Sequence, residues 1–149
     1  MQNHSYSNQL YIRANPKLVF NAITKEIDKW WTEQSNKINK VGDKLFVQFE
    51  KETSWEMDIV EYSHNFSTEW KVINANHDLE KLSRKDEWKN TTIKWKIEEN
   101  EEGSKVSIIH EGLVPNLECF SICMNGWDYF LESLKKYLET GKGTPYRNI

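Results

Sequence analysis

A series of short alternating segments, followed by one long amphipathic segment, is the sequence feature that most constrains the fold of this chain. Apolar and polar residues alternate in six segments, which lie within residues 6–12, 45–50, 55–60, 66–72, 93–97 and 106–110. Alternation places the apolar side chains on one face of a strand and the polar ones on the other. This pattern is typical of antiparallel sheets that have one buried and one wet face.

The last predicted element is a long helix over about residues 117–140. Its apolar residues recur at helical spacing, and Gly141 follows as the expected stop. A shorter helix is predicted to begin at Asn15-Pro16, since Asn is a good N-cap and Pro suits the first helical position. An apolar sheet face must be covered, and only the C-terminal helix is long enough to do so. We therefore expect an α+β, helix-grip fold, in which a curved antiparallel sheet wraps around the long C-terminal helix and leaves a cavity between them.

Length and charge exclude several classes of protein. The 149 residues fit a single domain over residues 1–149, with residues 1–5 as a flexible tail. The net charge is −3, and no basic cluster is present to neutralise phosphates, so we expect no nucleic-acid partner. We also expect no membrane association, because no apolar run approaches the roughly 20 residues of a membrane span. The polar N-terminus is unlike a signal peptide, which predicts a cytoplasmic protein.

Aromatic residues make up much of the apolar content, with seven Trp, six Tyr and six Phe. Large rings fill cores efficiently, and they also line pockets for small molecules. Five of them share the inward-facing positions of the strands and of the last helix. The predicted cavity lining therefore comprises Phe49, Trp55, Trp70, Trp95 and Trp127, with a solid core as the alternative.

His110 has the same strand parity as Val106 and Ile108, so it should point inward near the end of its strand. It is predicted to be a polar group at the cavity mouth that orients a ligand or acts as an acid or base. The alternative is a histidine at the core edge that is bonded to the backbone. Glu111 should face the opposite way, so the two residues do not form an obvious dyad.

Cys119 and Cys123 are four residues apart, which places both on one face of a helix. They could form half of a metal site or a redox pair. A structural zinc site needs four ligands, usually with close cysteine pairs, and no second pair exists. His77 lies in a polar stretch with no metal-ligand spacing. We therefore interpret the cysteines as small buried residues and expect no metal and no cofactor.

Four segments together resemble a known family. They are residues 12–16 with 19–23, the Trp30-Trp31 pair, residues 42–45 before a strand, and Gly126-Trp127 followed by residues 134–141. The chain is similar in these segments to the START-like (SRPBCC, helix-grip) superfamily, and within it to bacterial relatives of the activator of the heat-shock protein 90 ATPase. The resemblance implies a sheet wrapped on the last helix around a hydrophobic cavity. It implies no single activity, since relatives include lipid carriers, aromatic-polyketide cyclases, hormone receptors and co-chaperone domains.

Three functions follow from these observations. The sequence lacks a glycine-rich phosphate loop, a GxSxG motif and an HExxH motif, which argues against common nucleotide, hydrolase and metalloprotease chemistry. We expect a small binding protein whose internal cavity takes an apolar or aromatic small molecule, rather than a catalyst. The first alternative is a protein–protein regulator, including a partner of heat-shock protein 90. The second is a cyclase- or lyase-like enzyme that acts in the cavity.

Overall fold

The computed structural model describes residues 5–147, in which seven strands, two α-helices and one short 3-10 helix follow one another. In chain order these are β1 (Tyr6–Ile12), α1 (Pro16–Lys25), η1 (Ile27–Lys29), β2 (Gln34–Ser35), β3 (Lys44–Gln48), β4 (Ser54–Ser63), β5 (Ser67–Asn76), β6 (Thr92–Asn100), β7 (Gly103–Glu111) and α2 (Phe120–Thr140).

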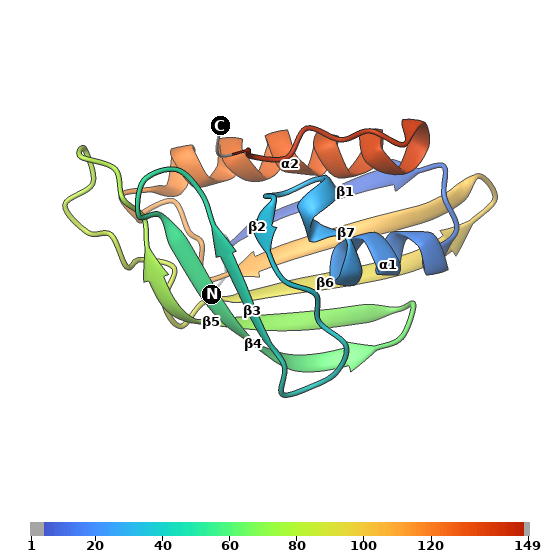
Figure 1. Cartoon of the computed structure of the whole chain (residues 1–149), viewed down its shortest axis with the longest axis horizontal. Coiled ribbons are helices and arrows are strands. Elements are labelled where there is room, and N and C mark those ends of the chain that lie inside the picture. Colours follow the sequence, from blue (N-terminus) through green and yellow to red (C-terminus); the bar gives the residue numbers. More distant parts are fainter. Residues whose placement is uncertain (1–4, 148–149) are drawn as a thin grey trace.

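The strands form one antiparallel sheet in the order β1-β7-β6-β5-β4-β3-β2 (Figure 1). Five of the six pairings join strands that are consecutive in the chain, and β1 closes the other edge by pairing with β7 from Tyr6 opposite His110 to Ile12 opposite Ser104. The register between β4 and β5 shifts at two places, and such bulges increase the local twist of a strand. The resulting curled sheet confirms the predicted antiparallel architecture.

The two α-helices lie on the inner face of the sheet (Figure 1). Helix α1 begins as predicted, because the side chain of Asn15 accepts a hydrogen bond from the Leu18 N–H at 2.9 Å. Helix α2 buries residues at helical spacing and ends at Gly141, which adopts a left-handed conformation with φ of 87°. The helix begins at Phe120 rather than near residue 117, because Leu117 and Phe120 close separate turns before it. The structure thus confirms the predicted helix-grip fold.

The core is built largely from tryptophan. All seven tryptophans are buried, and one hydrophobic cluster contains them. The ring of Trp31 stacks on that of Trp127 with centroids 5.1 Å apart, and Trp30 stacks on Trp31 at 5.8 Å. The pair of tryptophans after η1 therefore fills part of the space between the sheet and α2.

The segment between β5 and β6, residues 77–91, differs from the polar excursion that the sequence suggests. Strand β5 continues to Asn76, and Leu82 and Trp88 are only 3% and 5% exposed. These two apolar side chains fold the segment back onto the core, at the end of the molecule where α2 begins. Residues 77–91 therefore pack against the core on the inner face of the sheet.

The two ends of the described chain are both held by hydrogen bonds. The predicted flexible tail lies mostly outside the described residues; at its last position, Ser5 Oγ accepts a hydrogen bond from the Gly112 N–H at 2.9 Å. Near the other end, Tyr146 forms a parallel bridge with Thr32. Within residues 5–147, no helix is both long and apolar enough to cross a membrane.

Candidate functional site

A pocket of about 200 Å³ lies between the inner face of the sheet and the first half of α2. Its walls are mainly aromatic and are formed by Trp31, Phe49, Trp55, Trp88, Trp127 and Phe130. The polar groups of Glu50, Thr53, His77 and Cys123 also line it, together with Ile122 and Gly126 of α2. A concave, mostly apolar space with few polar groups is the usual form of a small-molecule site.

Each wall of the pocket comes from a different element. Trp55 lies on β4 and stacks on Trp88 of segment 77–91, with centroids 4.3 Å apart. Phe49 follows β3 and contacts Trp55 edge-on at 5.4 Å. Trp127 and Phe130 project from α2 three residues apart, which places them on the same side of the helix. Such ring contacts hold the walls in defined positions, because offset and edge-on arrangements are favoured.

One wall of the pocket carries an unpaired hydrogen-bond donor. Within the described part of the chain, three buried side-chain atoms have no hydrogen-bond partner, namely Trp55 Nε1, Asn65 Oδ1 and Trp95 Nε1. Only Trp55 among them lines the pocket. A buried donor without an acceptor costs free energy.

The residues predicted to line the cavity fall into two groups. Phe49, Trp55 and Trp127 line the pocket. Trp70 and Trp95 do not; they are completely or almost completely buried, and Trp70 Nε1 donates a hydrogen bond to Thr68 Oγ1 at 3.0 Å. They pack behind the pocket, because the ring of Trp31 stacks on Trp70 and that of Trp30 contacts Trp95 edge-on.

His110 points inward as predicted but lies behind the pocket, completely buried. Trp127 Nε1 donates a hydrogen bond to its Nδ1 at 3.0 Å, so Nδ1 carries no proton. The proton therefore lies on Nε2, which faces Thr91 Oγ1 at 2.8 Å, and Thr91 in turn donates to the Trp88 carbonyl at 2.6 Å. Burial lowers the pKa of His110 to about 3. The ring is thus a neutral connector between α2 and segment 77–91.

A cluster of His77, Cys119 and Cys123, here called the thiol–imidazole cluster, lies beside the pocket. One ligand atom from each residue lies within 4.8 Å of the other two. Cys123 Sγ is 3.9 Å from His77 Nδ1 and accepts a hydrogen bond from Trp88 Nε1 at 3.1 Å. The hydrogen bond between the two thiols lowers the pKa of Cys119 and raises that of Cys123. The pair therefore loses its first proton from Cys119.

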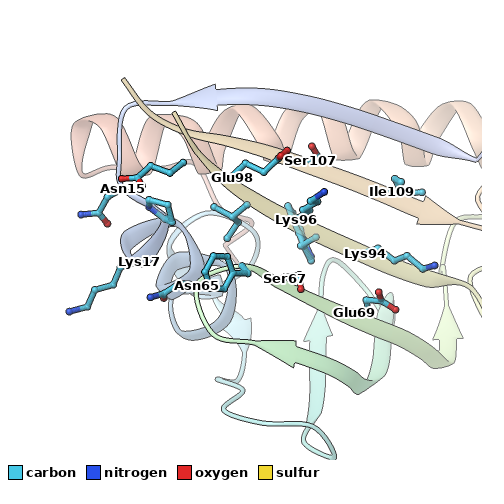
Figure 2. A pocket seen from close by; sticks show the side chains of 15 residues that line it. Asn15, Lys17, Asn65, Ser67, Glu69, Lys94, Lys96, Glu98, Ser107 and Ile109 are labelled. Carbon is cyan, nitrogen blue, oxygen red and sulfur yellow. The ribbon is translucent and has the colours of Figure 1, made fainter. Parts of the chain in front are cut away.

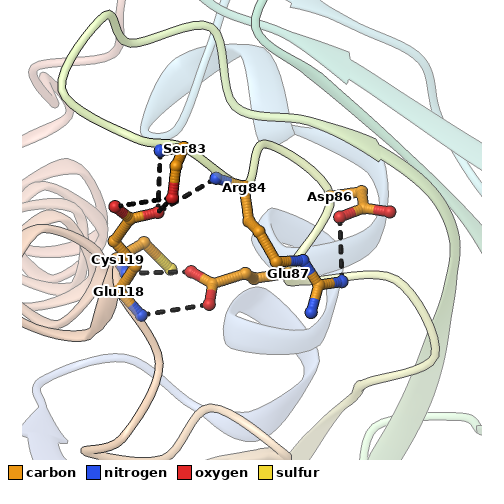
Figure 3. A network of polar contacts seen from close by, with 6 residues as sticks. All are labelled: Ser83, Arg84, Asp86, Glu87, Glu118 and Cys119. Atoms are coloured by element: carbon orange, nitrogen blue, oxygen red, sulfur yellow. Dashed lines mark hydrogen bonds and ion pairs between the residues drawn. The ribbon is translucent and has the colours of Figure 1, made fainter.

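A polar network holds segment 77–91 against the start of α2 (Figure 3). The carboxylate of Glu87 accepts hydrogen bonds from the backbone N–H groups of Glu118 and Cys119, each at 3.0 Å. The carboxylate of Glu118 accepts from the N–H groups of Ser83 and Arg84 at 2.8 and 3.0 Å, and these bonds lower its pKa. Two carboxylates thus satisfy free N–H groups of both segments, and the network fixes His77 and the cysteines relative to one another.

A second hollow, of about 800 Å³, lies on the opposite face of the sheet (Figure 2). Residues of both charges surround it, such as Glu69, Lys94 and Lys96. Phe66 and Ile109 also line it, with 67% and 45% of their surface exposed. Its volume exceeds that of the inner pocket, but charged side chains of both signs line it, which suits an apolar ligand less well than the aromatic walls of the inner pocket. The inner pocket is therefore the better candidate site for a small molecule.

Sequence reasoning missed the contribution of segment 77–91 to the site. Trp88 forms one wall of the pocket and His77 completes the thiol–imidazole cluster, yet both lie in a stretch dominated by charged residues. Leu82 and Trp88 are the signal that could have indicated docking, since large apolar side chains in a polar segment require burial.

The antiparallel sheet curled around a long C-terminal helix, with a pocket between them, defines a small α+β protein of the helix-grip class. The chain belongs to the family described as "Activator of Hsp90 ATPase homolog 1-like protein", whose sequence profile matches residues 13–139. No curated protein matches the chain.

Several solved structures share this fold. The Aha1 dimer from Colwellia psychrerythraea is 23% identical, with a TM-score of 0.78 over 93% of this chain and 98% of its own. A protein from Mesorhizobium loti is 14% identical, with a TM-score of 0.75 over 90% of this chain and 96% of its own. A protein from Staphylococcus saprophyticus is 19% identical, with a TM-score of 0.73 over 95% of this chain and 96% of its own. At these identities the likeness concerns the fold.

Proposed function

We propose that this protein binds a small aromatic molecule in the pocket between the sheet and α2. The observation that carries the proposal is the convergence of six aromatic walls on a space with one unpaired indole N–H. A solid core would leave no such space, and a site for a charged ligand would contain charged side chains at its base. The family relationship supports the proposal, because the fold leaves room between the sheet and its helix.

The volume of the pocket narrows the class of ligand. Pockets for drug-sized ligands measure about 300–1,000 Å³, whereas an engineered apolar cavity of about 150 Å³ binds benzene. At about 200 Å³, the pocket matches a ligand with one aromatic ring and a small substituent. Sterols, long fatty acids and multi-ring polyketides exceed this volume.

The unpaired donor narrows the class of ligand further. Trp55 Nε1 is buried without an acceptor. A phenol, benzaldehyde or similar neutral ligand would supply an oxygen acceptor while its ring packs against Trp88, Trp127 and Phe49. We therefore expect one-ring compounds with an oxygen substituent to bind more tightly than the corresponding hydrocarbons.

The test is a titration with phenol, benzaldehyde, toluene and a three-ring flavonoid, monitored by tryptophan emission and by two-dimensional NMR of the indole N–H signals. We expect phenol or benzaldehyde to shift the Trp55 signal and the flavonoid to leave it unchanged. The Trp55→Phe variant keeps a ring in the wall and removes the donor. It should weaken phenol binding by about 0.5–1.5 kcal/mol, the net value of one hydrogen bond.

Trp95→Phe is the matched control, because Trp95 Nε1 is also buried and unpaired but Trp95 does not line the pocket. It should leave phenol binding unchanged. Equal effects of the two substitutions, or the absence of binding by all four compounds, would contradict the proposal.

A protein partner is the second candidate. The exposed rings and aliphatic groups of Phe66 and Ile109 at the outer hollow favour it, since apolar side chains grouped on a surface mark interaction sites. The family description points to the ATPase of Hsp90 as the partner to test. An increase in that ATPase rate on addition of this protein, lost in Phe66→Ala, would favour this candidate over the pocket.

A further inference from the structure

We infer that His77, Cys119 and Cys123 form a binding site for a thiophilic divalent ion of the zinc class. This inference does not rest on the proposed aromatic ligand, although His77 and Cys123 also line that pocket. Two sulfurs and one imidazole nitrogen within 4.8 Å of one another form a ligand set that zinc accepts. Hard cations such as Mg²⁺ prefer oxygen ligands, so the set selects against them.

The geometry of the cluster is close to that of a metal site. Zinc binds sulfur at about 2.3 Å and imidazole nitrogen at about 2.0 Å, and tetrahedral bond angles then place the two ligand atoms about 3.6 Å apart. Cys123 Sγ and His77 Nδ1 lie 3.9 Å apart. A small rotation of either side chain suffices to bring both atoms into range of one ion.

The backbone already holds the three ligands in place. Cys119 occupies the N-cap position of α2, and the Cys123 N–H donates to the Cys119 carbonyl at 2.8 Å, so helical geometry fixes the two cysteines relative to each other. The His77 N–H donates to the Lys85 carbonyl at 2.7 Å. The Glu87 carboxylate bonds the backbone of Cys119, which joins segment 77–91 to the helix (Figure 3). The site is therefore formed before any ion binds.

The surroundings of the cluster suit thiolate ligands. Trp88 Nε1 donates a hydrogen bond to Cys123 Sγ at 3.1 Å, and such outer-shell donors orient and tune metal ligands. The ring of His77 packs edge-on against Trp55 at 5.4 Å, which restricts its rotation. When Zn²⁺ binds, the two thiols release their protons to solvent, and two thiolates then balance the charge of the ion.

Three protein ligands leave one coordination position of a tetrahedral ion open, as in sites that keep a water molecule. His77 and Cys123 also line the aromatic pocket, so the bound ion would lie at the pocket wall. The fourth position would then be filled by water.

The experiment is a titration of the reduced full-length protein with Co²⁺, which substitutes for Zn²⁺ and reports its ligands by absorption. We expect a thiolate-to-cobalt charge-transfer band and visible bands of tetrahedral cobalt, saturating at one ion per chain and lost on addition of Zn²⁺. His77→Ala, Cys119→Ser and Cys123→Ala should each weaken Zn²⁺ binding by more than about 100-fold, since even loss of an outer-shell partner costs 10–100-fold.

His64→Ala is the matched control, because His64 is exposed and lies outside the cluster. It should bind Co²⁺ and Zn²⁺ like the unaltered protein. Cys119→Ser is expected to fold, since serine is a good helix cap, and circular dichroism checks this. Cobalt binding without a thiolate band, or Zn²⁺ affinity unchanged in both folded Cys119→Ser and His77→Ala, would overturn the inference.

Discussion

At the scale of single residues, His110 carries one proton in the folded state, and its surroundings do not accommodate a second. Protonation of Nδ1 would break the hydrogen bond from Trp127 and place a charge among the rings of Trp88 and Trp127. Burial therefore lowers the pKa of His110 from its ordinary value of 6.5 to about 3. Between these two values, the unfolded chain binds a proton that the folded protein does not.

The free energy of unfolding should consequently fall as the pH drops below about 6.5. One proton bound only by the unfolded state changes the free energy of unfolding by about 1.4 kcal/mol per pH unit. We therefore expect this free energy to fall by about 2 kcal/mol between pH 7 and pH 5. Urea unfolding at pH 7 and at pH 5 measures this change in the free energy of unfolding. The His110→Gln variant keeps a donor and an acceptor but no titrating group, so its stability should change less over this range. Equal pH dependence of the two proteins would show that His110 is not responsible.

At the scale of elements, Gly126 in the first half of α2 links the stability of the helix to the pocket. A glycine inside a helix costs about 0.5–1 kcal/mol relative to alanine, and a Cβ atom at this position would meet nothing within 4 Å. Gly126→Ala should therefore raise the free energy of unfolding by about 0.5–1 kcal/mol. Because Gly126 also lines the pocket, the new methyl group should reduce its volume and weaken phenol binding.

Asn125→Ala provides the control for this element. Asn125 is exposed on the same helix and does not line the pocket, so the substitution should improve helix propensity without affecting phenol binding. Chemical denaturation and the phenol titration measure both effects. A Gly126→Ala protein with greater stability and unchanged phenol affinity would show that the pocket does not extend to α2 at this point.

At the scale of the whole molecule, the sheet and α2 could be predicted from sequence because their patterns are local. Alternation and helical spacing each place apolar side chains on one face, and these faces can pack together in few ways. The site could not be predicted in the same way. Trp88 meets Cys123 across 35 positions of the chain and His77 meets it across 46, so no local period reports these contacts. His110 was correctly oriented by strand parity, but its partners Thr91 and Trp127 depend on tertiary packing.

The C-terminal segment after α2 packs back onto the molecule, although the sequence suggested only a helix stop there. The Thr144 N–H donates to Ser133 Oγ on α2 at 2.7 Å, and Tyr146 exchanges backbone hydrogen bonds with Trp31 and Glu33. The ring of Tyr146 also packs on Phe49, a wall of the pocket, at 5.7 Å. The segment thus connects α2 with the chain that follows η1.

Gly143 permits this connection, because a Cβ atom there would lie 2.5 Å from the Lys29 carbonyl oxygen and 3.1 Å from that of Ser133. Gly143→Ala should therefore displace the segment and lower the free energy of unfolding by about 1–3 kcal/mol, the usual cost of overpacking. Phenol affinity should fall as well, because Tyr146 would no longer support Phe49. Lys142→Ala, at the exposed neighbouring position, should change stability by less than about 0.5 kcal/mol. If Gly143→Ala matched Lys142→Ala in both urea unfolding and phenol titration, the segment would contribute neither to the closure of the fold nor to the pocket.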